Sequence, residues 1–75
     1  MLMTAPLIIE ATAAHTASLI FLHGLGDTGY GWAPVMRQIA RKFRFMKFIL
    51  PHAPQRAVTL NYGMKMPAWY DIYTL

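Results

Sequence analysis

The sequence has 75 residues and no cysteine; 56% of its positions are hydrophobic, 13% are charged, and its net charge is +4 at pH 7. This composition excludes a disordered chain and a disulfide scaffold, and no apolar run approaches the roughly 20 residues of a membrane-spanning helix. Because so short a chain buries only about 60% of its unfolded surface when it folds alone, we expect either an unusually apolar small domain or a part of a larger one.

The N-terminal residues predict two strands. Leu7-Ile8-Ile9 is a short apolar run after a proline, and the small polar stretch 11–16 follows it, which indicates an edge strand and a turn. Residues 17–22 form a continuous apolar run, typical of a strand that is covered on both faces in a parallel sheet. We therefore expect Ser18 to be buried in this second strand.

A glycine-rich segment and a helix are predicted next. Residues 23–31 hold four of the five glycines, which indicates backbone that bends sharply or approaches a ligand closely. The periodicity that follows predicts a helix, with Pro34 in its first turn, where a missing N–H costs no intrahelical hydrogen bond. The apolar side of this helix consists of Trp32, Val35, Met36, Ile39, Ala40 and Phe43.

A third strand is predicted at residues 45–50, an apolar run that ends at Pro51. Strand, helix and strand in this order form a right-handed crossover, the repeating unit of an open α/β sheet. Beyond it, residues 57–60 and 66–70 flank Asn-Tyr-Gly at 61–63 and predict a small irregular hairpin. The expected fold class is α/β with an incomplete sheet, because three strands leave one sheet face and an edge uncovered.

The positive charge is concentrated in one stretch. Nucleic acid or an acidic membrane surface could bind such a cluster. A solvated helix face explains it more simply, because cations in the last turn complement the negative end of the helix dipole. We therefore expect no nucleic-acid partner and keep binding to an anionic surface as an alternative. The cluster consists of Arg37, Arg41, Lys42, Arg44 and Lys47.

The N-terminus gives an expectation about location. It has no cationic segment ahead of an apolar run, and Glu10 interrupts the one run that is present. A secretory signal needs both features. The sequence therefore predicts a cytoplasmic protein without a transmembrane segment.

The glycine-rich segment follows the carboxyl end of the second strand, where open α/β sheets bind their ligands. Its N–H groups and the following helix N-terminus could hold a phosphate or an oxyanion. Phosphate binding has the weaker case, because neither Gly-x-Gly-x-x-Gly nor Gly-x-x-x-x-Gly-Lys-[Ser/Thr] occurs. A His-Gly-x-Gly run directly after a buried strand instead looks like the oxyanion turn of an α/β-hydrolase.

Four sequence blocks, at residues 21–32, 50–54, 58–61 and 66–72, resemble the acyl-protein thioesterase and carboxylesterase (phospholipase/carboxylesterase) family of serine hydrolases in order and spacing. The resemblance implies the N-terminal β-α-β portion of an α/β-hydrolase fold. It also implies hydrolysis of acyl esters or thioesters by a Ser-Asp-His triad. No cofactor and no metal are expected.

The nucleophile motif of that family, Gly-x-Ser-x-Gly, does not occur, and Ser18 is the only serine. In α/β-hydrolases the triad aspartate and histidine follow the nucleophile, so no residue here is expected to belong to the triad. We expect residues 1–75 to be an N-terminal fragment of one hydrolase domain that needs the remainder and is inactive alone. The alternative is a short non-catalytic product that binds a partner or a complementary fragment through its open sheet edge.

The resemblance assigns roles in the glycine-rich segment. Leu25 matches the position whose backbone N–H contributes to the oxyanion hole, and Gly24 and Gly26 would let that backbone approach the substrate. The alternative is a tight turn without a ligand. His23 is expected to shape the loop by hydrogen bonds rather than to bind a metal, because no carboxylates lie at ligand spacing. Asp27 is expected to brace the loop or the helix N-terminus.

Three further residues are candidates for the acyl pocket. Trp69 follows a segment that lies near this pocket in the family. Met66 and Leu60 could line a groove for the acyl chain, because flexible apolar side chains suit a lipid tail. Packing within the protein core is the alternative for all three.

Overall fold

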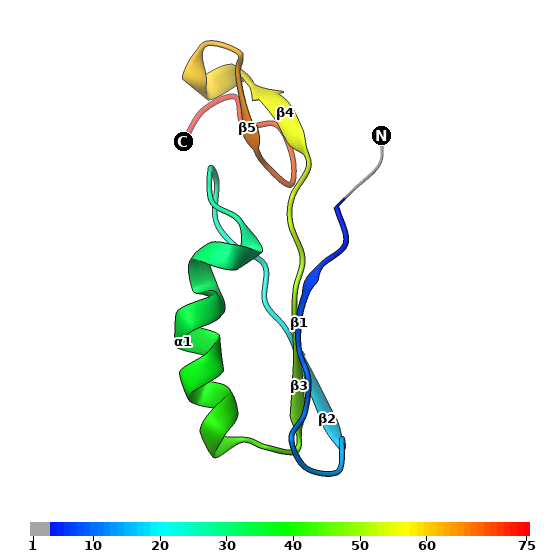
Figure 1. Cartoon of the computed structure of the whole chain (residues 1–75). Helices are drawn as coiled ribbons and strands as arrows, with labels where there is room; N and C mark the ends of the chain where they lie inside the picture. Colours follow the sequence, from blue (N-terminus) through cyan, green and yellow to red (C-terminus); the bar gives the residue numbers. More distant parts are fainter. Residues whose placement is uncertain (1–3) are drawn as a thin grey trace.

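The structure is a computed structural model and describes residues 4–75. Figure 1 shows an elongated chain in which one helix lies along a three-stranded sheet, with a two-stranded hairpin beyond the sheet's end. The elements are β1 (Leu7–Ile9), β2 (Ala17–Ile20), α1 (Gly29–Lys42), β3 (Met46–Leu50), β4 (Gln55–Val58), a 3₁₀ turn (Thr59–Asn61) and β5 (Met64–Pro67).

The sheet has the order β1-β3-β2. β2 and β3 are parallel and are joined through α1, while β1 pairs antiparallel with the other side of β3. The predicted α/β class, the strand-helix-strand order and the edge position of β1 are therefore confirmed within residues 4–75.

The core lies between α1 and one face of the sheet. Phe48 stands in register with Ile9 on one side and Leu19 on the other, and this row faces the helix. Phe48 and Leu50 are fully buried, and the helix covers them with Ala33 and Met36. Each fully buried aliphatic or aromatic side chain stabilises the fold by about 1.5–3 kcal/mol.

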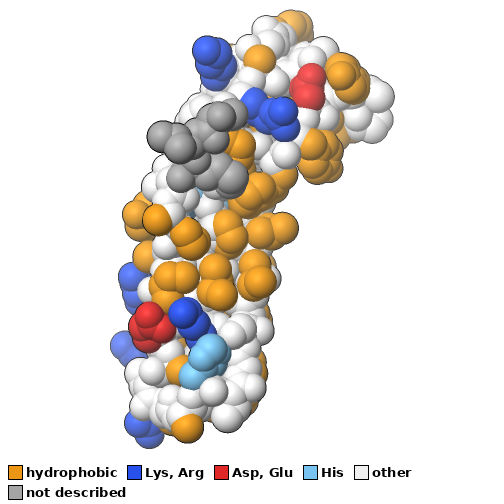
Figure 2. All heavy atoms as spheres, turned by 90° about the vertical axis from the view of Figure 1, so that its right-hand side faces the viewer, with side chains coloured by type: hydrophobic (Ala, Val, Ile, Leu, Met, Phe, Trp, Pro, Cys, Tyr) orange, Lys and Arg blue, Asp and Glu red, His pale blue; other side chains and the backbone are white. Residues whose placement is uncertain are grey.

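The opposite face of the sheet is apolar and open. Ile8, Ile49 and Ile20 are in register across the three strands, and Ile20 is 64% exposed. Figure 2 shows hydrophobic side chains gathered on this side of the molecule. Within residues 4–75, α1 covers only one face of the sheet, as the expected incomplete sheet implies, so the second strand is not covered on both faces here. Ser18 is exposed rather than buried, and its Oγ lies 2.8 Å from His15 Nε2.

The helix begins earlier than predicted. Its first residue is Gly29, so Pro34 lies inside the helix, beyond the first turn where we expected it. Residue 34 consequently offers no N–H to the carbonyl one turn before it. The early start reflects a contact with a distant segment, because the His52 ring accepts the N–H of Gly29 and holds this residue beside the end of β3.

The irregular hairpin is present, but its strands begin two residues earlier than predicted. β4 and β5 pair from Gln55–Pro67 to Val58–Met64. Between them, Tyr62 and Gly63 adopt positive φ angles of 58° and 74°. β5 ends at Pro67, where the prediction extends to residue 70; the Ala68 N–H still donates to Pro54 O (3.1 Å), and the Trp69 indole then bonds to the glycine-rich turn. No helix within residues 4–75 is both long enough and apolar enough to cross a bilayer.

Candidate functional site

The glycine-rich turn connects the end of β2 to α1 and is held by backbone hydrogen bonds, one within the turn and one to β5. The Gly26 N–H donates to Pro67 O (3.0 Å), and the Asp27 N–H donates to Gly24 O (3.2 Å). Gly26 has a φ of 79°, which favours glycine. Leu25 lies between these anchored residues, and within residues 4–75 its N–H has no acceptor. The Leu25 N–H is therefore a free backbone donor in this turn, as is that of Gly24, which also has no acceptor within residues 4–75.

The His23 side chain is buried under this turn, with 3% of its surface exposed. Its Nε2 accepts the N–H of Ala53 (3.0 Å), and its Nδ1 lies 2.8 Å from Gly24 O. A backbone N–H can only donate and a carbonyl can only accept, so the ring is neutral with its hydrogen on Nδ1. Both nitrogens are occupied, and residues 4–75 contain no metal-binding cluster.

Trp69 lies against His23, with ring centroids 5.0 Å apart, and its Nε1–H donates to His23 O (2.8 Å). This contact joins the glycine-rich turn to the segment after the hairpin. A cavity of about 210 Å³ opens between the two segments. It is lined by His23, Gly24, Leu25, Ala68, Trp69, Tyr70 and Ile72. The structure thus brings Leu25 and Trp69 together.

Leu60 and Met66 do not line this cavity. Leu60 lies in the 3₁₀ turn, and its N–H donates to the carbonyl of Ile72 (2.7 Å). Ile72 itself lines the cavity. Met66 lies in β5, where its Sδ accepts the Asn61 side-chain amide at 3.4 Å. Both residues are part-buried in the hairpin. Their assignment to an acyl groove remains a prediction.

Asp27 lies at the start of α1. Its Oδ1 accepts the N–H of Thr28 (2.7 Å), while Thr28, the N-cap residue, makes no capping bond with its own side chain. A Cβ at position 31 would overlap the Asp27 carboxylate, so Gly31 allows that carboxylate to lie against the first helical turn. The bracing role of Asp27 remains a prediction.

Two polar residues contribute to the site without having been assigned to it from the sequence. His52, which is 7% exposed, accepts the Gly29 N–H at Nδ1 (3.0 Å) and stacks on Tyr30 with centroids 4.7 Å apart. Asp71 accepts the Thr59 N–H and hydroxyl, both at 2.8 Å. These bonds, with the backbone one contributing most, lower the pKa of Asp71. In the sequence, the feature that could have identified His52 as a site residue is its position between Pro51 and Pro54, directly after a buried strand.

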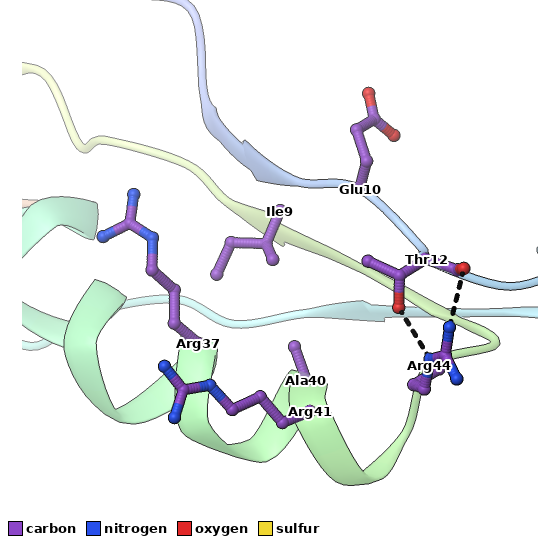
Figure 3. A pocket seen from close by; sticks show the side chains of 7 residues that line it. All are labelled: Ile9, Glu10, Thr12, Arg37, Ala40, Arg41 and Arg44. Carbon is purple, nitrogen blue, oxygen red and sulfur yellow. Dashed lines mark hydrogen bonds between the residues drawn. The ribbon is translucent and has the colours of Figure 1, made fainter.

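The cationic cluster lies elsewhere. Figure 3 shows Arg37, Arg41 and Arg44 around a second cavity of about 420 Å³, beside β1 and the C-terminal half of α1. The Arg44 side chain donates to Thr12 Oγ1 at 3.3 Å, and Arg41 lies in the last helical turn. Arg41 and Lys42, in the last helical turn, fit the helix-dipole explanation.

Comparisons with known proteins place this geometry in a family. Residues 3–75 match the family described as Phospholipase/Carboxylesterase. The acyl-protein thioesterase 1 of Neurospora crassa is 57% identical over 72 residues, which cover 93% of this chain and 29% of the relative. That of Gibberella zeae is 52% identical over 73 residues, which cover 95% of this chain and 31% of the relative. The chain thus spans about three tenths of the length of these curated relatives.

Solved structures agree with the sequence matches. The crystal structure of Zea mays acyl-protein thioesterase 2 is similar with a TM-score of 0.86 and 33% identity, over 93% of this chain and 29% of that one. Arabidopsis thaliana SOBER1 is similar with a TM-score of 0.68 and 35% identity, over 81% of this chain and 29% of that one. The predicted family is confirmed: the chain belongs to the phospholipase/carboxylesterase family of α/β-hydrolases.

Proposed function

We propose that residues 1–75 form the N-terminal part of a serine hydrolase domain that cleaves acyl esters or thioesters, and that Leu25 supplies one backbone donor of its oxyanion hole. The family and the names of the relatives support the reaction class. The remainder of the domain would supply the serine nucleophile, the triad aspartate and histidine, and the other donors. In this proposal the 75 residues alone have no hydrolase activity.

The free N–H of Leu25 is the observation that carries the proposal. When a nucleophile attacks an acyl carbonyl, negative charge develops on the oxygen, and a preorganised N–H aimed there stabilises the transition state more than the ground state. Of the N–H groups that follow, that of Gly26 donates to Pro67 O in β5 and that of Asp27 to Gly24 O within the turn, whereas that of Leu25 is available beside the cavity. No rearrangement of the turn is then needed during the reaction.

The substrate side of the proposal rests on the second wall of the cavity. Trp69 is held by its own hydrogen bond, so its ring offers a rigid apolar surface opposite Leu25. An acyl chain would contact this surface while its carbonyl oxygen faces the turn. Leu60 and Met66 would extend the apolar wall along the hairpin. A cytoplasmic location belongs to the same proposal.

The test removes the Leu25 N–H from the complete enzyme that carries this segment. An ester in place of the Gly24–Leu25 peptide bond, introduced by semisynthesis, deletes this donor. We expect kcat on a nitrophenyl acyl ester and on an acyl thioester to fall about 10²–10³-fold, the range for one oxyanion-hole donor. Leu25→Ala is the matched control, because it keeps the N–H and changes only a partly exposed side chain. A correctly folded ester variant with wild-type kcat would show that the turn is purely structural.

A further inference from the structure

Two histidines tie the glycine-rich turn to the segment after β3 in a reciprocal way. His23 lies in the turn and accepts the N–H of Ala53 from the other segment (3.0 Å). His52 lies in that other segment and accepts the N–H of Gly29 from the end of the turn (3.0 Å). Each segment thus contributes one imidazole acceptor and one backbone donor. Both bonds are buried.

The two bonds require opposite tautomers. The His23 ring accepts at Nε2 and carries its hydrogen on Nδ1, because Nδ1 faces the carbonyl of Gly24. The His52 ring accepts at Nδ1, so in the neutral ring the hydrogen is on Nε2. Within residues 4–75 that Nε2 has no partner, and the bond at Nδ1 is the one that connects the ring to the turn.

The geometry leaves little freedom at this junction. A Cβ on Gly29 would lie 2.6 Å from Leu50 O and 2.9 Å from His52 Cε1, so the start of α1 is in close contact with the end of β3. Tyr30 stacks on the His52 ring. Any change in the His52 position therefore displaces the first residues of α1 and, with them, the C-terminal end of the turn.

We propose that His23 and His52 form a histidine clasp, defined as the two reciprocal bonds above, which sets the position of the Leu25 N–H relative to the rest of the active site. Neither ring is proposed to touch the substrate's reacting atoms, so both are positioning residues. This inference rests on the proposed function. In it, one imidazole acceptor aligns each end of the oxyanion turn: His23 at the start and His52, which binds the Gly29 N–H, at the end.

The experiment compares two variants of His52 in the complete enzyme. His52→Phe keeps a planar ring next to Tyr30 but removes the acceptor, whereas His52→Asn keeps an acceptor oxygen close to the position of Nδ1 and removes the ring. We expect His52→Phe to lower kcat by about 10-fold to 100-fold, because a small misplacement of a transition-state donor costs this much. KM should change little, since the donor acts on the transition state. His52→Asn should recover most of kcat.

A second measurement does not depend on activity. Long-range ¹H–¹⁵N NMR of the ¹⁵N-labelled wild-type enzyme reports which imidazole nitrogen carries hydrogen. We expect the Nδ1–H form for His23 and the Nε2–H form for His52. The same tautomer in both rings would overturn the clasp even if His52→Phe fails to fold.

The outcomes separate the two proposals. A wild-type enzyme without esterase or thioesterase activity would refute the proposed function, whatever its tautomers. An active wild type in which His52→Phe keeps its kcat, or in which His52→Asn is no better than His52→Phe, would refute the clasp alone. Reduced kcat in His52→Phe, recovery in His52→Asn and opposite tautomers together support it.

Discussion

Replacing Gly29 by alanine is a sharp test of the junction between α1 and β3. In an ordinary helix this change is stabilising, by up to about 1 kcal/mol, because alanine is the better helix former. Here the new Cβ would lie 2.6 Å from Leu50 O, a backbone atom of a fully buried strand residue. Because this oxygen cannot move without shifting β3, the helix start must move instead.

The magnitude follows from three contributions. Overpacking of a buried site costs about 1–3 kcal/mol, and weakening the bond from the Gly29 N–H to His52 adds about 0.5–1.5 kcal/mol. The gain in helix propensity offsets about 1 kcal/mol of this cost. We therefore expect Gly29→Ala to lower the free energy of unfolding of the proposed complete enzyme by about 0.5–3.5 kcal/mol.

Urea denaturation and thermal melting measure this effect. In a domain of 150–250 residues, each kcal/mol of lost unfolding free energy lowers Tm by about 2–4 °C. Gly24→Ala is the matched control, because a Cβ added at this position would have no atom within 4 Å and the φ of Gly24 is not positive. It should change the stability by less than about 0.5 kcal/mol. A Gly29→Ala enzyme as stable as the wild type would refute the close approach of helix and strand.

Three further outcomes are expected. A fluorophosphonate probe should leave the isolated 75-residue chain unlabelled, because the proposed nucleophile lies in the remainder of the domain. Stoichiometric labelling of Ser18, whose hydroxyl lies beside His15, would contradict this. Phe48→Ala should lower the free energy of unfolding in urea by about 3–5 kcal/mol, because Phe48 is fully buried, whereas Phe45→Ala, at an exposed site, should cost much less. The pKa of Asp71 is lowered in the folded state, so its contribution to stability is present above its unfolded pKa and is lost as the pH falls through the folded value. Asp71→Asn should therefore flatten the acid side of the plot of unfolding free energy against pH. An unchanged plot would refute this prediction.

The sequence predicted the order of the elements well because the local signals agree with one another. The apolar runs at 7–9 and 45–50 become β1 and β3, and the helical periodicity becomes α1. The boundaries were less predictable, since they depend on contacts between distant segments. The early start of α1 depends on His52, 23 residues away from Gly29. Beyond the end of β5, Trp69 bonds to His23, 46 residues away.

The candidate site was predictable only where a backbone pattern marks it. Four glycines in nine residues identify the turn, and with it Leu25. Nothing in the spacing of His23 and His52 indicates that each ring accepts an N–H from the other's segment, because this pairing arises only when β2 and β3 align. The exposure of Ser18 was missed for a related reason, since a continuous apolar run does not say which face a helix will cover.

The clasp has a consequence for synthesis on the ribosome. Its two bonds span 30 and 23 residues, and all of their atoms lie within the first 53 residues of the chain. At about 5–20 residues per second, in a proposed enzyme of the length of its Neurospora crassa relative, both histidines and the strands next to them would be synthesised roughly 10–40 s before the end of the chain. In the proposed enzyme, the anion-binding corner would thus be assembled before the nucleophile has been translated. During that interval Ile8, Ile20 and Ile49 on the open face of the sheet form the apolar surface that a nascent-chain chaperone would have to shield.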